Sequence, residues 1–161
     1  MNELIKVGMA DLKVCKAPDG LTTLGLGSCV GICIWDAAAG VGGLAHIMLP
    51  DSTKIKNNSN IYKFADSAID ELIKELCEAG ASRSRLKAKI AGGAQMFAFE
   101  SQQAAMRVGL ANVDAVREKL KKEGIPIVAE DTGGSHGRTI AFYPESGKLS
   151  IRAFDHPELI I

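Results

Sequence analysis

Residues 25–36 read Gly25-Leu-Gly-Ser-Cys29-Val30-Gly-Ile-Cys-Ile-Trp-Asp36, and this stretch decides the fold. Its second part, 30–36, is apolar at both odd and even positions and rich in β-branched residues, which is typical of a buried strand. A turn of small residues follows, and 43–49 read as the next strand. The stretch therefore predicts a buried β-hairpin whose first strand begins directly after a glycine-containing bend at Cys29.

Further strands and two helices flank this hairpin. Apolar residues recur at helical spacing over 61–76, where Asn60 is a candidate N-cap and Gly80 a candidate C-terminal stop. A second helix is predicted over 113–123, with Asn112 capping its start. The remaining predicted strands are 5–14, 21–26, 86–91, 125–130, 138–143 and 148–154. The pattern predicts one α+β domain over residues 1–161.

Composition excludes several classes of function. The chain has 161 residues, of which 47% are hydrophobic and 24% charged, as in an ordinary globular domain. Lys plus Arg and Asp plus Glu both number 19, so the balanced charge argues against nucleic acid and anionic lipid as partners. No secretory signal or membrane-spanning apolar run is present, and four scattered cysteines suit a reducing compartment. We therefore expect a cytoplasmic protein.

The bend before the hairpin could carry chemistry. Glycines around Cys29 allow a tight turn that leaves main-chain N–H groups free beside a thiol, which is how an oxyanion hole is built. A histidine that takes the thiol proton would activate the sulfur. His46 lies on the second strand of the hairpin and can meet Cys29 across it, whereas His136 in a later loop is an alternative. A buried core cysteine and core histidine remain the competing interpretation.

The sequence supports a metal site or a redox site less than it supports a Cys–His site. Cys29 and Cys33 share a face of one strand but lie about 13 Å apart, too far to bind one metal ion. The chain contains no CxxC or HxxxH pair, so no metal site is expected. A redox-sensing thiol would need a resolving cysteine near Cys29, and Cys33 is badly placed for that role.

Taken in order, these segments are similar to those of the CheD family of chemoreceptor glutamine deamidases. The Gly-Ser-Cys and Ala-His-x-Met-Leu-Pro motifs at this spacing form a specific signal, and the matching stretches cover nearly the whole chain. One departure is Ala111, which stands where the family pattern has a basic residue. The matching stretches are 24–30, 43–50, the helix that begins near Tyr62, Ala88 to Phe97, 108–112 and 130–138.

The resemblance implies a fold, a site and partners. The implied fold is a sandwich of two β layers with helices packed on one outer face. The implied catalytic residues are Cys29, His46 and Thr23, with Thr22 as an adjacent alternative to Thr23. Ser28, Gly93 and Asn112 also match, as candidates for the oxyanion hole or for the pocket lining. No cofactor is expected.

The implied reaction is deamidation of glutamine side chains on methyl-accepting chemoreceptors through a cysteine thioester. A second implied role is binding to a CheC-type chemotaxis phosphatase, which is compatible with the first. Because the target glutamines lie on helical coiled coils, we expect a shallow, open site in which the Cys29 thiol is accessible.

Overall fold

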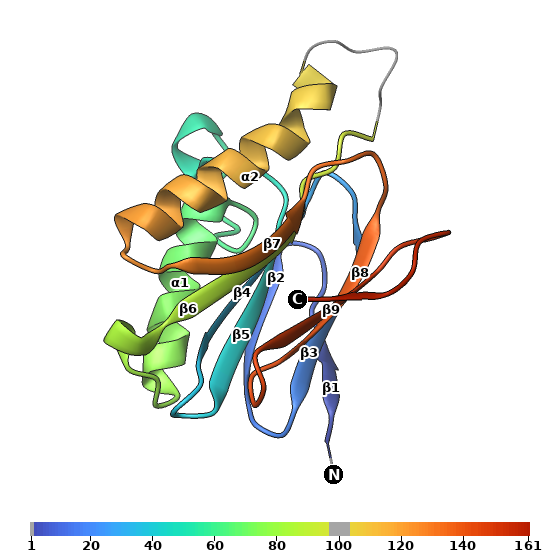
Figure 1. Cartoon of the computed structure of the whole chain (residues 1–161). Coiled ribbons are helices and arrows are strands. Elements are labelled where there is room, and N and C mark those ends of the chain that lie inside the picture. The colour runs from blue at the N-terminus through green and yellow to red at the C-terminus, as the bar shows by residue number, and fades with distance from the viewer. Residues whose placement is uncertain (1, 97–103) are drawn as a thin grey trace.

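Two five-stranded sheets lie face to face in the computed structural model, which describes residues 2–96 and 104–161 (Figure 1). The β3 sheet has the order β1-β3-β8-β9-β10, and the β4 sheet has the order β2-β5-β4-β6-β7. Phe97 lies outside the described residues. In the β3 sheet the strands are β1 (Leu4–Lys6), β3 (Gly20–Leu26), β8 (Arg138–Tyr143), β9 (Lys148–Arg152) and β10 (Leu159–Ile160). In the β4 sheet they are β2 (Asp11–Lys16), β5 (Val41–Ile47), β4 (Val30–Asp36), β6 (Lys87–Gly92) and β7 (Ile127–Thr132).

The helices α1 (Ala65–Glu78) and α2 (Ala104–Lys122) both pack on the β4 sheet, on the face turned away from the β3 sheet (Figure 1). Short 3₁₀ turns, η1 (Ser52–Lys54) and η2 (Arg83–Arg85), connect neighbouring elements. The predicted sandwich with helices on one outer face is confirmed. Among the described residues, no helix is long and apolar enough to cross a membrane.

Two apolar cores follow from this layering. One lies between the β4 sheet and the helices and contains Ile32, Ile69 and Leu72. The other lies between the two sheets and contains Cys29, Leu44 and Phe142. Because β4 has a core on each face, all seven of its residues are buried, which explains its continuous apolar sequence.

The predicted hairpin is present, and its register places Gly31 opposite His46. Strand β4 matches the predicted residues at both ends, and β5 begins two residues before the predicted start. On its other edge β4 pairs with β6, so the strand that follows Cys29 is held on both sides. The bend is thereby anchored to the centre of the sheet.

The predicted start of the first helix is wrong. Helix α1 begins at Ala65 after Phe64, which provides no side-chain cap, while Asn60 accepts a hydrogen bond from the main chain of Tyr62 instead. The chain before the helix runs beside the end of β5, where the N–H groups of Met48 and Leu49 both donate to the Lys63 carbonyl. This tertiary pairing keeps the segment extended and delays the helix.

The predicted start of the second helix is also wrong, since α2 already runs from Ala104. Asn112 is predicted to cap the start of this helix, yet both Asn112 and Gly109 lie inside it. Gly109 is needed there because a Cβ atom would lie 2.4 Å from the Ala94 carbonyl oxygen. Asn112 is buried and bonds to chain segments outside the helix, so packing outweighs its low helix propensity.

Candidate active site

Cys29 and His46 both face the space between the two sheets. Cys29 belongs to the core between the sheets, and His46 contacts Thr23 from the opposite sheet. Gly31 pairs with His46, and Cys29 lies two residues before Gly31 on the same face of the hairpin. Cys29 and His46 are therefore diagonal neighbours, and Gly31 has no side chain that could lie between them. The Nε2 atom of His46 is buried and has no hydrogen-bond partner among the described residues.

Thr23 fixes the tautomer of His46. The Thr23 Oγ1 atom donates to the Val7 carbonyl at 2.7 Å and also lies 2.7 Å from His46 Nδ1. A hydroxyl has one proton, which here goes to Val7, so the Thr23 oxygen accepts from a protonated Nδ1. The lone pair of the neutral imidazole then lies on Nε2, where a base must carry it. Thr22 points elsewhere and donates to the Ile140 carbonyl at 2.7 Å.

Burial favours the neutral forms of both groups. It lowers the pKa of His46, and it raises the pKa of the Cys29 thiol, although the main-chain N–H of Cys29 partly offsets that rise. A neutral thiol beside a neutral imidazole is therefore the resting state near pH 7. Proton transfer must then accompany attack on a substrate.

Access to the sulfur is narrower than expected for an open site. Cys29 is only 9% exposed and His46 is fully buried. The side chain of Met96 lies over Gly27, where a Cβ atom would approach its Cγ at 3.3 Å. The expected open site with an accessible Cys29 thiol is therefore wrong, because Cys29 is buried.

The carbonyl groups of the bend all point into the protein. The N–H of Ala94 donates to the Gly27 oxygen at 2.8 Å, and that of Gly93 donates to the Cys29 oxygen at 2.8 Å. Between them, the Nδ2 atom of Asn112 donates to the Ser28 oxygen at 2.9 Å. No main-chain carbonyl among the described residues accepts from the N–H groups of Ser28 and Cys29. Both N–H groups are therefore left unused by main-chain pairing.

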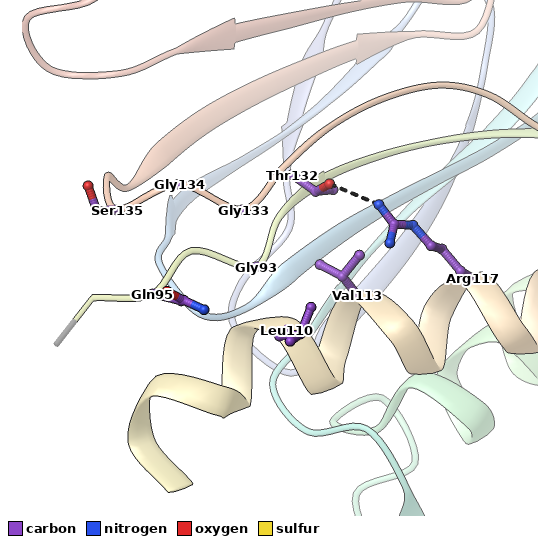
Figure 2. A pocket seen from close by; sticks show the side chains of 9 residues that line it. All are labelled: Gly93, Gln95, Leu110, Val113, Arg117, Thr132, Gly133, Gly134 and Ser135. Atoms are coloured by element: carbon purple, nitrogen blue, oxygen red, sulfur yellow. Dashed lines mark hydrogen bonds between the residues drawn. The ribbon is translucent and has the colours of Figure 1, made fainter. Parts of the chain in front are cut away.

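A pocket of about 430 Å³ is lined in part by Gly93 (Figure 2). Neither Cys29 nor His46 lines it. Its lining residues are Gly93, Gln95, Leu110, Val113, Arg117, Thr132, Gly133, Gly134 and Ser135. Figure 2 shows Arg117 reaching from α2 towards Thr132, where its Nη2 lies 3.4 Å from the hydroxyl oxygen. The same guanidinium also pairs with Glu130 at 2.5 Å, so the charge in the pocket is already neutralised.

The other candidate residues lie elsewhere. The His136 ring stacks on His156 with centroids 4.3 Å apart, and neither ring is placed against Cys29. Cys33 is fully buried, and its burial raises the pKa of its thiol. Within residues 2–96 and 104–161, no three His, Cys, Asp or Glu side chains converge as metal ligands. Among the candidate catalytic residues, Thr23 and His46 are in contact, and Cys29 lies in the core between the two sheets.

Comparison with known proteins places this geometry in a family. The family model described as CheD chemotactic sensory transduction matches residues 48–153. A "probable chemoreceptor glutamine deamidase CheD" of Lachnoclostridium phytofermentans is 61% identical over 158 residues, which cover 98% of each chain. This chain belongs to the CheD family. The relative from Halalkalibacterium halodurans, named "chemoreceptor glutamine deamidase CheD", is 54% identical over 98% of each chain.

The CheD fold also resembles a solved structure outside these close relatives. A Neisseria meningitidis protein of the family DUF152 superposes with a TM-score of 0.52 at 12% identity. The match covers 82% of this CheD chain and 64% of the other. At that identity the likeness concerns the fold alone.

Proposed function

We propose that this CheD chain hydrolyses glutamine side chains of bacterial methyl-accepting chemoreceptors to glutamate, with Cys29 as nucleophile, His46 as base and Thr23 as orienting group. The single observation that carries the proposal is the hydrogen bond between Thr23 and His46 Nδ1, which leaves an unpaired basic Nε2 on the face shared with Cys29. The names of the close relatives support the substrate.

The first half of the reaction forms a thioester. The Cys29 sulfur attacks the amide carbon while His46 Nε2 takes the thiol proton, because neither group is charged at rest. The carbonyl oxygen becomes an oxyanion, and the free N–H groups of Ser28 and Cys29 are placed to hold it. The protonated His46 then gives its proton to the amide nitrogen, the C–N bond breaks and ammonia leaves.

The second half releases glutamate. Water attacks the thioester carbon while His46 Nε2 accepts its proton, and the new tetrahedral oxyanion occupies the same donors. When that intermediate collapses, the C–S bond breaks and the proton returns to the Cys29 sulfur. The enzyme is regenerated and the receptor gains one carboxylate.

The narrow access to Cys29 favours a glutamine side chain over a main-chain amide. A glutamine carries its amide at the end of two methylene groups, so its amide can approach a residue that is only 9% exposed. A peptide bond would bring its whole backbone to the sulfur. This argument supports a deamidase rather than a protease.

Exposed apolar side chains beside the bend offer a surface for a protein partner. Leu24 and Met96 beside the bend are 55% and 44% exposed, and exposed apolar side chains suit a protein contact. We assign that contact to receptor helices and, in competition with them, to a CheC-type phosphatase. Since the receptor glutamines in question lie in the cytoplasmic helices, the proposal places this chain in the cytoplasm.

The test is to incubate the protein with a receptor cytoplasmic fragment and to map glutamine-to-glutamate conversion by peptide mass spectrometry. Wild type should convert particular glutamines, and Cys29→Ala should convert none. Cys33→Ala is the matched control, because it removes a buried thiol from β4, the strand that follows Cys29, and leaves the bend unchanged. Identical maps from wild type and Cys29→Ala would exclude the proposed function.

A further inference from the structure

Asn112 lies between the two halves of the candidate site. Its Nδ2 group donates to the Ser28 carbonyl at 2.9 Å and to the Met48 carbonyl at 3.0 Å. Ser28 directly precedes the nucleophile, and Met48 follows His46 by two residues. One fully buried side chain from α2 therefore ties the bend to the strand that carries the base.

The orientation of the Asn112 amide is determined by these contacts. Both neighbouring acceptors are carbonyl oxygens, so the amide nitrogen and not its oxygen must face them. The Oδ1 atom has no hydrogen-bond partner among the described residues. A buried polar side chain inside a helix, with one atom unpaired, is costly for folding alone. The two hydrogen bonds that Asn112 donates, to Ser28 and to Met48, position the bend relative to the end of β5, and this role explains the buried amide.

The bond to Ser28 also sets the direction of a catalytic donor. In a trans peptide the C=O and the N–H point in opposite directions. The Ser28 carbonyl and the Cys29 N–H belong to one peptide group, so holding the carbonyl towards α2 turns the N–H towards the sulfur side. Ala94 does the same for the preceding peptide, because its bond to the Gly27 carbonyl turns the Ser28 N–H outward.

We infer that Asn112 is a positioning residue, which aims the Cys29 N–H at the developing oxyanion and keeps the nucleophile in register with His46. This inference rests on the proposed deamidase activity and assigns Asn112 a role outside the pocket lining. The same N–H contributes to lowering the pKa of the Cys29 thiol, so its alignment also affects the sulfur.

The test uses Asn112→Leu, which keeps the branched shape and removes both donors, and Asn112→Ala in case the larger side chain disturbs folding. Each variant should lower kcat for receptor deamidation on the order of 10²-fold, the size expected for one misplaced oxyanion donor, with KM unchanged. Val116→Ala is the matched control, since it cuts a buried side chain of the same helix that makes no bond to the bend. It should lower the melting temperature and leave kcat unchanged.

A second measurement does not need the receptor. Alkylation of Cys29 by iodoacetamide is followed against pH by mass spectrometry, with the exposed Cys77 as an internal reference thiol. The midpoint for Cys29 should rise in both Asn112 variants and stay in place in Val116→Ala. Unchanged kcat together with an unchanged midpoint in a folded Asn112 variant would overturn the inference. If wild type shows no deamidation, the proposed function fails, while the alkylation midpoint still decides the role of Asn112.

Discussion

Thr23 and His46 belong to different sheets, and the 2.7 Å contact between their side chains joins β3 to β5 across the interior of the sandwich. The imidazole is therefore oriented only when both sheets are packed together. The site differs in this respect from one built on a single loop, because its base depends on the assembled core.

Replacing Thr23 with valine should impair catalysis more than stability. Valine keeps the shape but cannot accept from His46 Nδ1, so the wrong tautomer becomes accessible. We expect kcat to fall on the order of 10²-fold, less than the roughly 10⁴-fold seen when a charged orienting group is lost from a triad. Thr23→Ser should retain most activity. Thr22→Val is the control: it loses a bond to Ile140, and steady-state kinetics with a receptor fragment should show kcat near wild type.

The pH profile of kcat/KM should have a broad plateau. The pKa of His46 lies below its ordinary 6.5 because of burial, so protonation of the base should end activity only below that pH. The pKa of Cys29 lies above its ordinary 9.0 for the same reason, so the alkaline limb should fall above that pH. Initial rates across the range, with the fold monitored at each pH, provide the measurement. An acid limb centred above pH 6.5 would instead indicate a stabilised imidazolium.

Asp36 should dominate the acid sensitivity of folding at the opposite end of the hairpin. Hydrogen bonds from Arg85, and from the main chain of Ser82 and Ala39, lower the pKa of its buried carboxyl to about 2. A depressed pKa stabilises the fold above the ordinary value of 3.8, and the contribution is lost as the pH falls towards 2. Urea unfolding of Asp36→Asn should show lower stability at neutral pH and a flatter acid limb. The exposed Asp114→Asn should leave both unchanged.

Gly93→Ala should disturb the bend at Cys29, because the new methyl group would clash with Val113. Gly93 has a φ of +69°, and an added Cβ would lie 2.2 Å from Val113 Cγ2, so the loop that donates to Cys29 must move. Gly80 has a φ of +112° with open space around it. Gly80→Ala should therefore cost about 1 kcal/mol in the free energy of unfolding through backbone strain alone. Gly93→Ala should cost more and also reduce kcat, and equal losses for the two variants would argue against a role for this contact.

The hairpin could be predicted because its signals are local. An apolar β-branched run, a turn of small residues and a second apolar run set both strands, and antiparallel pairing then sets which residues meet. The sequence predicts that residues 29 and 46 meet across the hairpin, whereas the observed register pairs His46 with Gly31, two residues further along. In contrast, β1 with β3 and β6 with β7 pair in parallel, and such contacts leave little trace in nearby sequence.

The contacts around the site could be predicted from the sequence less well than the hairpin. Thr23 could be connected with His46 only through the family resemblance, since the contact joins two sheets. Asn112 resembled a helix cap because asparagine is common there, yet its partners lie on segments far away in the chain. The neutral resting state of Cys29 and His46 depends on burial, which the packed structure reveals and the spacing of residues does not.

The order of the segments along the chain has a consequence for biosynthesis. The thiol, the imidazole and the hydroxyl are all encoded between residues 23 and 46, whereas the groups that hold the bend come from residues 93–112. A ribosome therefore exposes the reactive trio well before it produces the segments that shape it. We therefore expect the nascent polypeptide to be inactive until α2 has packed against the bend.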